Sequence, residues 1–152
     1  MLKAVIVATT VALAISALPS AALAAKPEIY SPAFSRVAVE GYDPVAYFTL
    51  GRPEKGSEAF TTTYKGAEFR FASAANLARF KANPGAYAPQ FGGYCAWAVS
   101  QNYTAKGDAQ YWRIVNGKLY LNYSADVQKK WEKNIPGFIA KGNSNWPNVI
   151  QK

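Results

Sequence analysis

The chain has 152 residues, half of them hydrophobic, and a formal net charge of +8 at pH 7. One cysteine and no histidine exclude an intramolecular disulfide. They also argue against a zinc or copper(I) site within one chain, because such sites need several thiolate or imidazole ligands. The lysines and arginines are spread along the sequence, which is typical of a solvated surface, and we expect no nucleic-acid partner.

The first 24 residues have the three parts of a secretory signal peptide. Lys3 is the only charged residue before Lys26, segment 4–18 is apolar or small, and Ala22-Leu23-Ala24 places small residues where a signal peptidase reads them. The apolar run is shorter than the roughly 20 residues of a membrane-spanning helix. We therefore predict a signal peptide over residues 1–24, cleavage near Ala24, a periplasmic or secreted protein, and no membrane anchor after cleavage.

The segments after the signal predict a lead-in and a first hairpin. Residues 25–36 contain two prolines and little periodicity, which indicates an irregular lead-in, and a short strand is expected at 37–39. Threonines and aromatics dominate 60–64, Lys65-Gly66 forms a turn signal, and 67–71 alternates in polarity. This pattern predicts a β-hairpin.

Polar residues mark the expected helix starts. Asp43, followed by Pro44, is expected to cap a short helical turn. Ser73 caps a helix that stops at residues 83–85, and Ser124 caps one that runs to about residue 134. A further short helix is expected over 135–146.

The second half of the chain predicts a second hairpin. Segment 93–100 is apolar and rich in small residues, which favours a short buried helix, with a strand as the alternative. Segments 111–115 and 118–123 flank Asn116-Gly117, the preferred pair for a tight hairpin turn. No internal repeat is recognised. The expected fold is α+β, a small single domain in which two β-hairpins pack with several short helices.

An ordered set of short motifs resembles the YHS-domain proteins, in their exported single-domain form. The matching residues are Asp43-Pro44-Val45, Tyr64-Lys65-Gly66, Phe69, Phe71, Ser73, Phe80, Pro84, Tyr87, the run 92–96 and the run 116–122. The resemblance covers residues 37–123, which we expect to form the YHS-like domain. Residues 124–152 are then a C-terminal helical extension packed on the same domain.

The resemblance implies a link to metals without a direct site. YHS modules occur in copper-transporting ATPases and in some oxygenases. The metal-associated form carries cysteines at three positions, which here are Ala46, Ala72 and Asn76. We therefore expect no metal ligands and no cofactor. Binding of copper or another metal is implied by the family resemblance only.

Cys95 is the one candidate for a catalytic residue. Gly92-Gly93 before it offers backbone N–H groups that lower a thiol pKa, whereas its apolar neighbours favour a buried, inert side chain. No histidine is present to act as its base. The candidates for a ligand pocket are mainly aromatic: Tyr42, Asp43, Tyr47, Tyr94, Cys95 and Trp97.

The sequence favours a binding role over catalysis. We expect an exported, non-enzymatic binding or accessory protein in a metal- or redox-related envelope system, whose partner is a small ligand or an envelope protein. One alternative is a thiol-dependent redox or stress enzyme centred on Cys95. A second alternative is a structural domain that engages another envelope protein. The sequence does not indicate the ligand or the oligomeric state.

Overall fold

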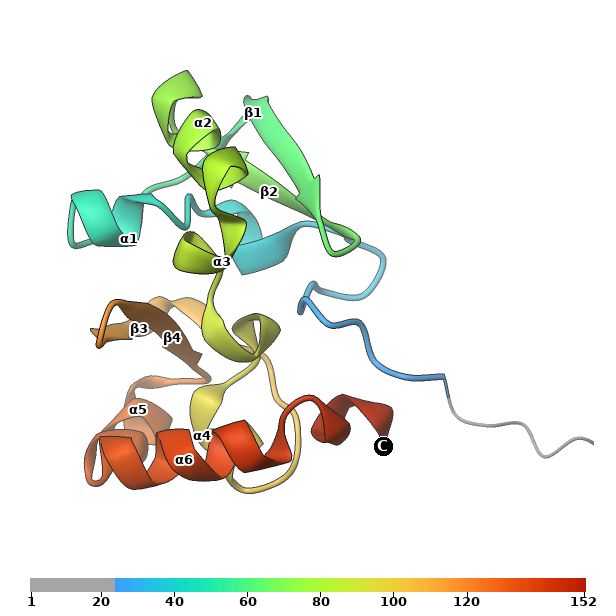
Figure 1. Cartoon of the computed structure of the whole chain (residues 1–152), viewed down its shortest axis with the longest axis vertical. Helices are drawn as coiled ribbons and strands as arrows, with labels where there is room; N and C mark the ends of the chain where they lie inside the picture. Colours follow the sequence, from blue (N-terminus) through green and yellow to red (C-terminus); the bar gives the residue numbers. More distant parts are fainter. Residues whose placement is uncertain (1–23) are drawn as a thin grey trace, which may run out of the picture.

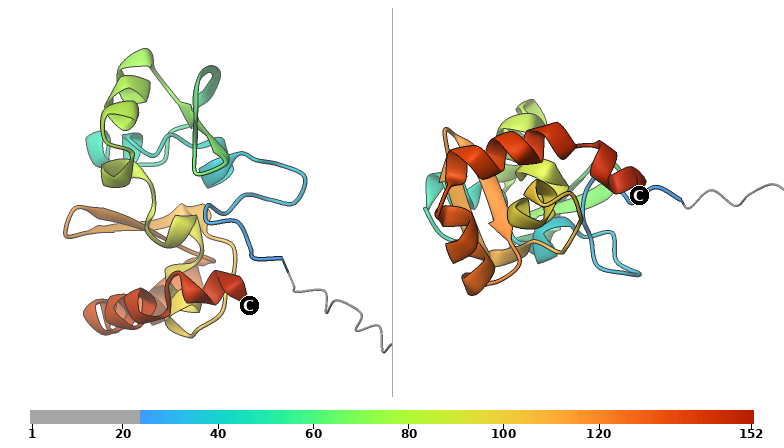
Figure 2. Two further views of the ribbon diagram at one scale, coloured as in Figure 1. Left: turned by 45° about the vertical axis from the view of Figure 1, so that its right-hand side comes forward. Right: turned by 90° about the horizontal axis from the view of Figure 1, so that it is seen from below.

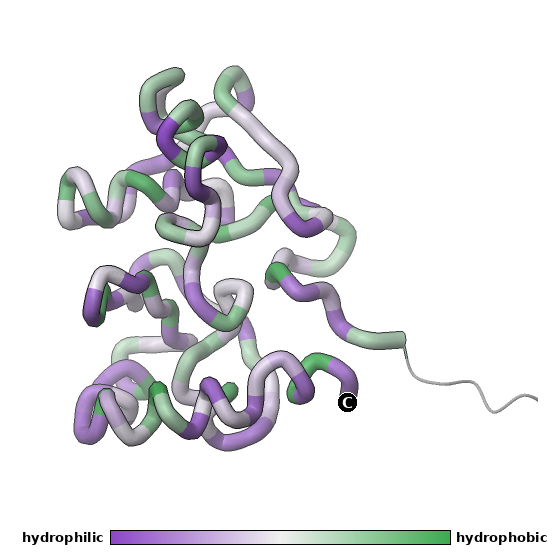
Figure 3. The backbone as a smooth tube through the Cα atoms, viewed as in Figure 1, coloured by the Kyte–Doolittle hydropathy of each residue, from purple (hydrophilic) through white to green (hydrophobic). Residues whose placement is uncertain are grey.

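The computed structural model describes residues 24–152, so the predicted signal peptide lies outside the described residues except for Ala24. The described chain contains two two-stranded antiparallel sheets and six α-helices, which confirms the α+β class. Within this range no helix is long and apolar enough to cross a membrane. Hydrophobic and hydrophilic residues alternate along both halves of the backbone in Figure 3.

The elements fall into two groups, one above the other in Figure 1. We call residues 38–87 the first unit. Its elements in order are a 3-10 turn η1 (Ala38–Gly41), α1 (Ala46–Thr49), β1 (Ser57–Tyr64), β2 (Ala67–Phe71), α2 (Ala74–Ala82) and α3 (Pro84–Tyr87). The strand expected at 37–39 is wrong, because Ala38–Gly41 is a 3-10 turn and Val37 makes only an isolated bridge to Glu68.

We call residues 90–145 the second unit, and it repeats the same order of elements. These are η2 (Gln90–Gly93), α4 (Ala96–Ser100), β3 (Asp108–Val115), β4 (Lys118–Asn122), α5 (Ala125–Glu132) and α6 (Ile135–Asn145). A last turn, η3 (Asn148–Gln151), follows. The apolar segment expected to be a short buried helix thus contains α4, and the second hairpin forms as expected.

The two units agree in backbone conformation as well as in order. Each 3-10 turn holds three successive residues at positive φ, 53°, 53° and 80° over residues 39–41 and 54°, 62° and 82° over residues 91–93. Both hairpins turn through two positive-φ residues, Lys65-Gly66 and Asn116-Gly117, and both have a register shift near the start of the first strand. The chain therefore forms one supersecondary arrangement twice, and the expectation of no repeat is wrong.

Equivalent residues also cap and fill the two units. The Ser73 hydroxyl accepts a hydrogen bond from the Asn76 N–H at 3.1 Å, and the Ser124 hydroxyl accepts one from the Val127 N–H at 3.3 Å. The helix after each hairpin, α2 or α5, buries one large aromatic residue completely, Phe80 in the first unit and Trp131 in the second. The cap keeps its residue type, whereas the buried aromatic keeps only its role, so the repeat is weak at the level of sequence.

The units share one of the two hydrophobic clusters of the described chain and do not stand apart. Leu119 and Leu121 of β4 pack in the same cluster as Phe69 and Phe71 of β2. The Tyr47 hydroxyl of α1 donates a hydrogen bond to the Ala109 carbonyl of β3 at 2.8 Å. Because β4 packs into the core of the first unit, we expect the two units to unfold together.

The lead-in joins both units without forming a helix or a strand. The Lys26 N–H donates to the Ile150 carbonyl in η3, and the Tyr30 N–H donates to the Gly92 carbonyl in η2, both at 2.8 Å. Both views in Figure 2 show this blue segment beside the C-terminal turn. Ile29 is buried in the shared core, so the lead-in is anchored by packing as well as by hydrogen bonds.

Candidate functional site

Asp43 organises the first unit through a fully buried carboxylate. Its Oδ1 accepts hydrogen bonds from the N–H groups of Val45 at 2.8 Å and Ala46 at 3.3 Å. Its Oδ2 accepts from the Ala72 N–H at 2.8 Å and from the Asn76 Nδ2 at 2.7 Å. Asp43 therefore ties the start of α1 to the end of β2 and to α2. All four of these bonds hold the fold together, which is the capping role expected of it.

Cys95 has the same place in the second unit that Asp43 has in the first. It precedes α4, and the backbone N–H groups of Trp97, Ala98 and Tyr123 lie near enough to its thiol to lower the thiol pKa. Those three donors stand where Asp43 has its three backbone donors, two at the start of the short helix and one after the second strand. The thiol thus lies in a ring of N–H groups that holds a carboxylate in the first unit.

The Cys95 side chain is almost completely buried and stays protonated. Burial is the largest effect on its pKa and raises it above the ordinary thiol value, and the three nearby backbone N–H groups oppose that shift without cancelling it. The thiol donates to the Asn122 Oδ1 at 3.6 Å. A thiol that is protonated at neutral pH is a poor nucleophile, because the thiolate is the reactive form.

Asn122, the last residue of β4, links the Cys95 thiol to the start of α4. Its side chain is fully buried, and its Oδ1 also accepts a hydrogen bond from the Trp97 N–H at 3.1 Å. Its Nδ2 has no hydrogen-bond partner among the described residues. Asn122 therefore positions the start of α4 over the thiol.

A small apolar cavity of about 220 Å³ opens beside the thiol. We call it the Cys95 pocket. No charged side chain belongs to its lining, which consists of Cys95, Trp97, Ala98, Tyr103, Ala105, Tyr123 and Val127.

The pocket follows from the residue changes between the two units. In the first unit Asn76 on α2 reaches the Asp43 carboxylate directly. In the second unit the residue at the equivalent place on α5 is Val127, which has no polar atom to reach the thiol, and it lines the pocket instead. The cavity therefore lies where the first unit has a hydrogen-bonded side chain.

The structure separates the residues that the sequence grouped into one pocket. Cys95 and Trp97 both line the Cys95 pocket, whereas Tyr94 does not. The Tyr94 hydroxyl donates to the Pro27 carbonyl at 2.8 Å, and its ring packs on Tyr30 with centroids 5.3 Å apart. Burial raises the pKa of Tyr94 to about 12. Tyr94 therefore anchors the lead-in, although it is the neighbour of Cys95 in sequence.

The other three candidates lie in the first unit. The Tyr42 ring is half-buried beneath the Lys55 ammonium, which lies 4.1 Å from the ring centroid. Tyr47 is buried against Trp112, with centroids 5.1 Å apart, and burial raises the pKa of its hydroxyl far above the ordinary value. Together with Asp43 these residues build the core of the first unit and do not meet Cys95 in one pocket.

Sequence reasoning missed five residues of the Cys95 pocket, namely Ala98, Tyr103, Ala105, Tyr123 and Val127. A signal for two of them was present. Ser73 and Ser124 both begin a helix directly after a hairpin, and aligning the chain on these two caps places Tyr123 and Val127 beside the residue equivalent to Asp43. Tyr103 lies in the loop between α4 and β3, where no pattern in the chain points to the pocket.

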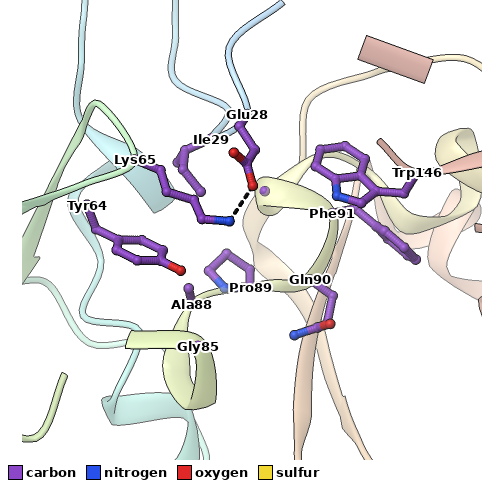
Figure 4. Close-up of a pocket in the computed structure, with 11 residues that line it drawn as sticks. Glu28, Ile29, Tyr64, Lys65, Gly85, Ala88, Pro89, Gln90, Phe91 and Trp146 are labelled. Carbon is purple, nitrogen blue, oxygen red and sulfur yellow. Dashed lines mark hydrogen bonds and ion pairs between the residues drawn. The ribbon is translucent and has the colours of Figure 1, made fainter. Parts of the chain in front are cut away.

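A second hollow, of about 180 Å³, lies between the two units and is shown in Figure 4. It is lined by Tyr64 and Lys65 from the first hairpin, by residues 88–92 and by Trp146. Lys65 forms an ion pair with Glu28 across it, and this hydrogen bond raises the pKa of Lys65. Because its charged groups already pair with each other, this hollow is the weaker candidate for a ligand site.

The residues do not suit a bound transition metal. Among residues 24–152 no group of three or more histidine, cysteine, aspartate or glutamate side chains is placed to hold a metal ion. The three positions where the resemblance implies cysteines hold Ala46, Ala72 and Asn76, the last already bonded to Asp43. Alanine offers no side-chain donor, and the chain has no imidazole to compensate. We therefore assign no chemistry in this protein to a metal.

The comparisons with known proteins agree with the motifs. The sequence model of the YHS domain matches residues 45–91, which run from just before α1 in the first unit into η2 of the second. A search of curated proteins and a search of solved structures return no significant match. The matched segment includes the Val45 and Ala46 donors, the first hairpin and α2. The chain therefore contains a YHS domain.

Proposed function

We propose that this YHS-domain protein is an exported binding module that takes a small apolar molecule into the Cys95 pocket. The observation that carries the proposal is the pocket itself, an apolar cavity of about 220 Å³ with a buried thiol at its floor. Apolar cavities with few polar groups are the usual form of small-molecule sites. The proposal places the protein in the periplasm or outside the cell, on the basis of the signal-like first 24 residues.

A binding role is favoured over a thiol enzyme by the state of Cys95. Its raised pKa keeps the thiol protonated, and the chain has no histidine to remove the proton. Asn122, its side-chain neighbour, accepts hydrogen bonds from it but has no basic group. Any part in a metal- or redox-related envelope system would then be an accessory one, through the bound ligand or a partner protein.

Ligand entry is tested by titrating ¹⁵N-labelled protein, residues 25–152, with the neutral probe 3-phenylpropanamide. We expect saturable shifts of the Trp97 indole N–H and of the Tyr103 and Tyr123 amides. Val127→Phe fills the pocket from α5 and should abolish these shifts. Ala125→Phe, at an exposed position on the same helix, is the matched control and should leave them intact. Absence of saturable shifts in the wild type would reject the proposal.

Export is tested separately. The full-length chain and a chain that starts at Ala25 are expressed in a bacterium, and periplasmic and cytoplasmic fractions are compared. We expect the full-length chain to appear in the periplasm in a form shortened at its N-terminus. Retention of both chains in the cytoplasm at full length would overturn this part of the proposal.

A further inference from the structure

We infer that the ligand of the Cys95 pocket is a small aromatic anion, an inference that rests on the function proposed above. The size of the cavity sets the first limit. An apolar cavity of about 150 Å³ is enough to hold benzene, and the Cys95 pocket measures about 220 Å³. One six-membered ring with a short side chain therefore fills it, whereas a fused-ring ligand would have to displace its walls.

Three of the seven residues that line the pocket are aromatic. Trp97 and Tyr103 meet edge to face, with ring centroids 6.3 Å apart and planes at 83°. Tyr123 forms another wall after β4. Rings in this arrangement offer both a face and an edge to a further ring, which is the geometry that aromatic groups prefer. The walls therefore favour an aromatic body over a branched aliphatic one.

The inner end and the outer end of the Cys95 pocket, its floor and its mouth, differ in solvent exposure. Cys95 and Ala98 at the floor are each only 1% exposed, whereas Tyr103 and Tyr123 at the mouth are 48% and 47% exposed. A ligand that places its ring against the floor keeps any polar group in contact with water at the mouth. The site thus accepts a charged substituent without burying its charge.

Two lysines lie against the aromatic walls. The Lys130 ammonium of α5 is 5.6 Å from the centroid of the Trp97 ring, and the Lys106 ammonium is 5.5 Å from that of Tyr123. Both cations already interact with these rings, as lysines do within about 6 Å of an aromatic face. A cationic ligand would be repelled by them, and an anionic group at the mouth would be attracted.

The acidic residues near the pocket do not cancel the positive charge at its mouth. Lys106 also pairs with Asp108 at 3.6 Å, and that carboxylate accepts a hydrogen bond from the Gln110 N–H as well. On α5 there is one exposed acidic residue, Asp126, and there are two exposed lysines, Lys129 and Lys130. The segments that enclose the pocket, residues 95–106 and 123–130, contain three lysines and one aspartate. The field at the mouth is therefore positive.

The inference is tested with three probes that share one ring and differ in charge. These are 3-phenylpropanoate, 3-phenylpropanamide and 3-phenylpropylammonium, each titrated into ¹⁵N-labelled protein at low ionic strength. We expect the anion to bind about fivefold more tightly than the amide, the size of a partly exposed charge contact, and the cation to bind most weakly. Lys130→Gln and Lys106→Gln should each remove part of this preference.

Lys129→Gln is the matched control, because it removes the same charge from the same helix at a lysine that lies over no aromatic ring of the described residues. It should lower the preference for the anion less than Lys130→Gln does, because only Lys130 of the two lies over a ring of the pocket wall. Equal binding of anion and amide, or tighter binding of the cation, would overturn this inference while leaving the proposed binding function standing. Failure of all three probes to bind would overturn both. Loss of the preference in Lys129→Gln to the same degree as in Lys130→Gln would also overturn the role of the rim lysines.

Discussion

Asp43 and Cys95 occupy equivalent places in the two units of this fold, each inside a ring of three backbone N–H donors. In the first unit the ring holds a carboxylate, and in the second it holds a protonated thiol. A carboxylate makes strong charge-assisted hydrogen bonds to such donors, whereas a thiol accepts weakly. The first ring therefore stabilises the fold, and the second leaves room for a pocket.

Replacing Asp43 by Ala should destabilise the whole protein. The substitution leaves the Ala72 N–H and the Asn76 side chain without their buried acceptor, and an unsatisfied buried donor costs about 1–3 kcal/mol. We expect the urea midpoint to fall by an amount equivalent to about 2–4 kcal/mol. Equilibrium urea unfolding followed by tryptophan fluorescence measures it. A midpoint equal to that of the wild type would show that Asp43 does not hold the unit together.

Cys95→Asp combined with Val127→Asn should recreate the centre of the first unit in the second. The single change Cys95→Asp buries a carboxylate without the amide donor that Asn76 supplies to Asp43. Adding Val127→Asn supplies it, so we expect a favourable coupling of about 1–2 kcal/mol in a double-mutant cycle. Urea unfolding of the four proteins measures the coupling. Strictly additive changes would contradict the equivalence of the two centres.

Cys95 should react slowly with thiol reagents in the folded state. It is 1% exposed, and its raised pKa lowers the thiolate fraction at pH 8. We expect labelling by a maleimide to be at least about a hundredfold slower than in the urea-unfolded chain, because both access and ionisation are reduced. Labelling at an equal rate in both states would restore the thiol-enzyme alternative.

The same pKa shift predicts a dependence of stability on pH. Because the folded state holds the Cys95 proton more tightly than the unfolded state, its contribution is present below the ordinary thiol pKa and is lost as the pH rises through the folded value. The wild type should therefore lose more stability between pH 7 and pH 10 than Cys95→Ser does. Thermal unfolding of both proteins across this range tests it. The comparison cancels the contribution of groups that do not interact with Cys95, because these are the same in both proteins.

Gly92→Ala should detach the lead-in from η2. Gly92 has a φ of +62°, and a Cβ there would lie 1.7 Å from the Glu28 carbonyl oxygen. Gly117→Ala is the matched control, because Gly117 also has a positive φ, +73°, but faces open space. The control should lower stability by only about 1–2 kcal/mol through backbone strain. Gly92→Ala should lower it clearly more and should also make residues 25–36 more susceptible to proteolysis. Equal losses in the two variants would show that the contact with Glu28 is unimportant.

Local patterns predicted both hairpins well. The Lys65-Gly66 and Asn116-Gly117 pairs lie at the two turns, with both residues of each pair at positive φ. Ser73 and Ser124 cap the helices that follow. These features depend on residues close together in the chain, so their physics is visible in the sequence. The strand expected at 37–39 failed because Val39 and Glu40 take a positive φ, a conformation that neither residue type suggests.

The candidate site was predicted only in part. Cys95 and Trp97 were named, but Tyr94 was placed beside them because it is their neighbour in sequence. In the folded chain the Tyr94 hydroxyl binds the lead-in instead, and Tyr103 and Tyr123 take its place at the pocket. Membership in a cavity depends on contacts between distant segments, and apart from the two serine caps no pattern in the chain indicates those contacts.

The sequence by itself determined the α+β class, the two hairpins, the helix caps and the YHS motifs, because each depends on local backbone preferences or on the order of residues. Tertiary structure alone decided that the second half repeats the first, that Cys95 stands where Asp43 stands, and that a pocket opens beside it. The physical reason is that a ring of backbone N–H donors is set by chain geometry and not by side-chain type. One ring can therefore hold a carboxylate in the first unit and a thiol in the second.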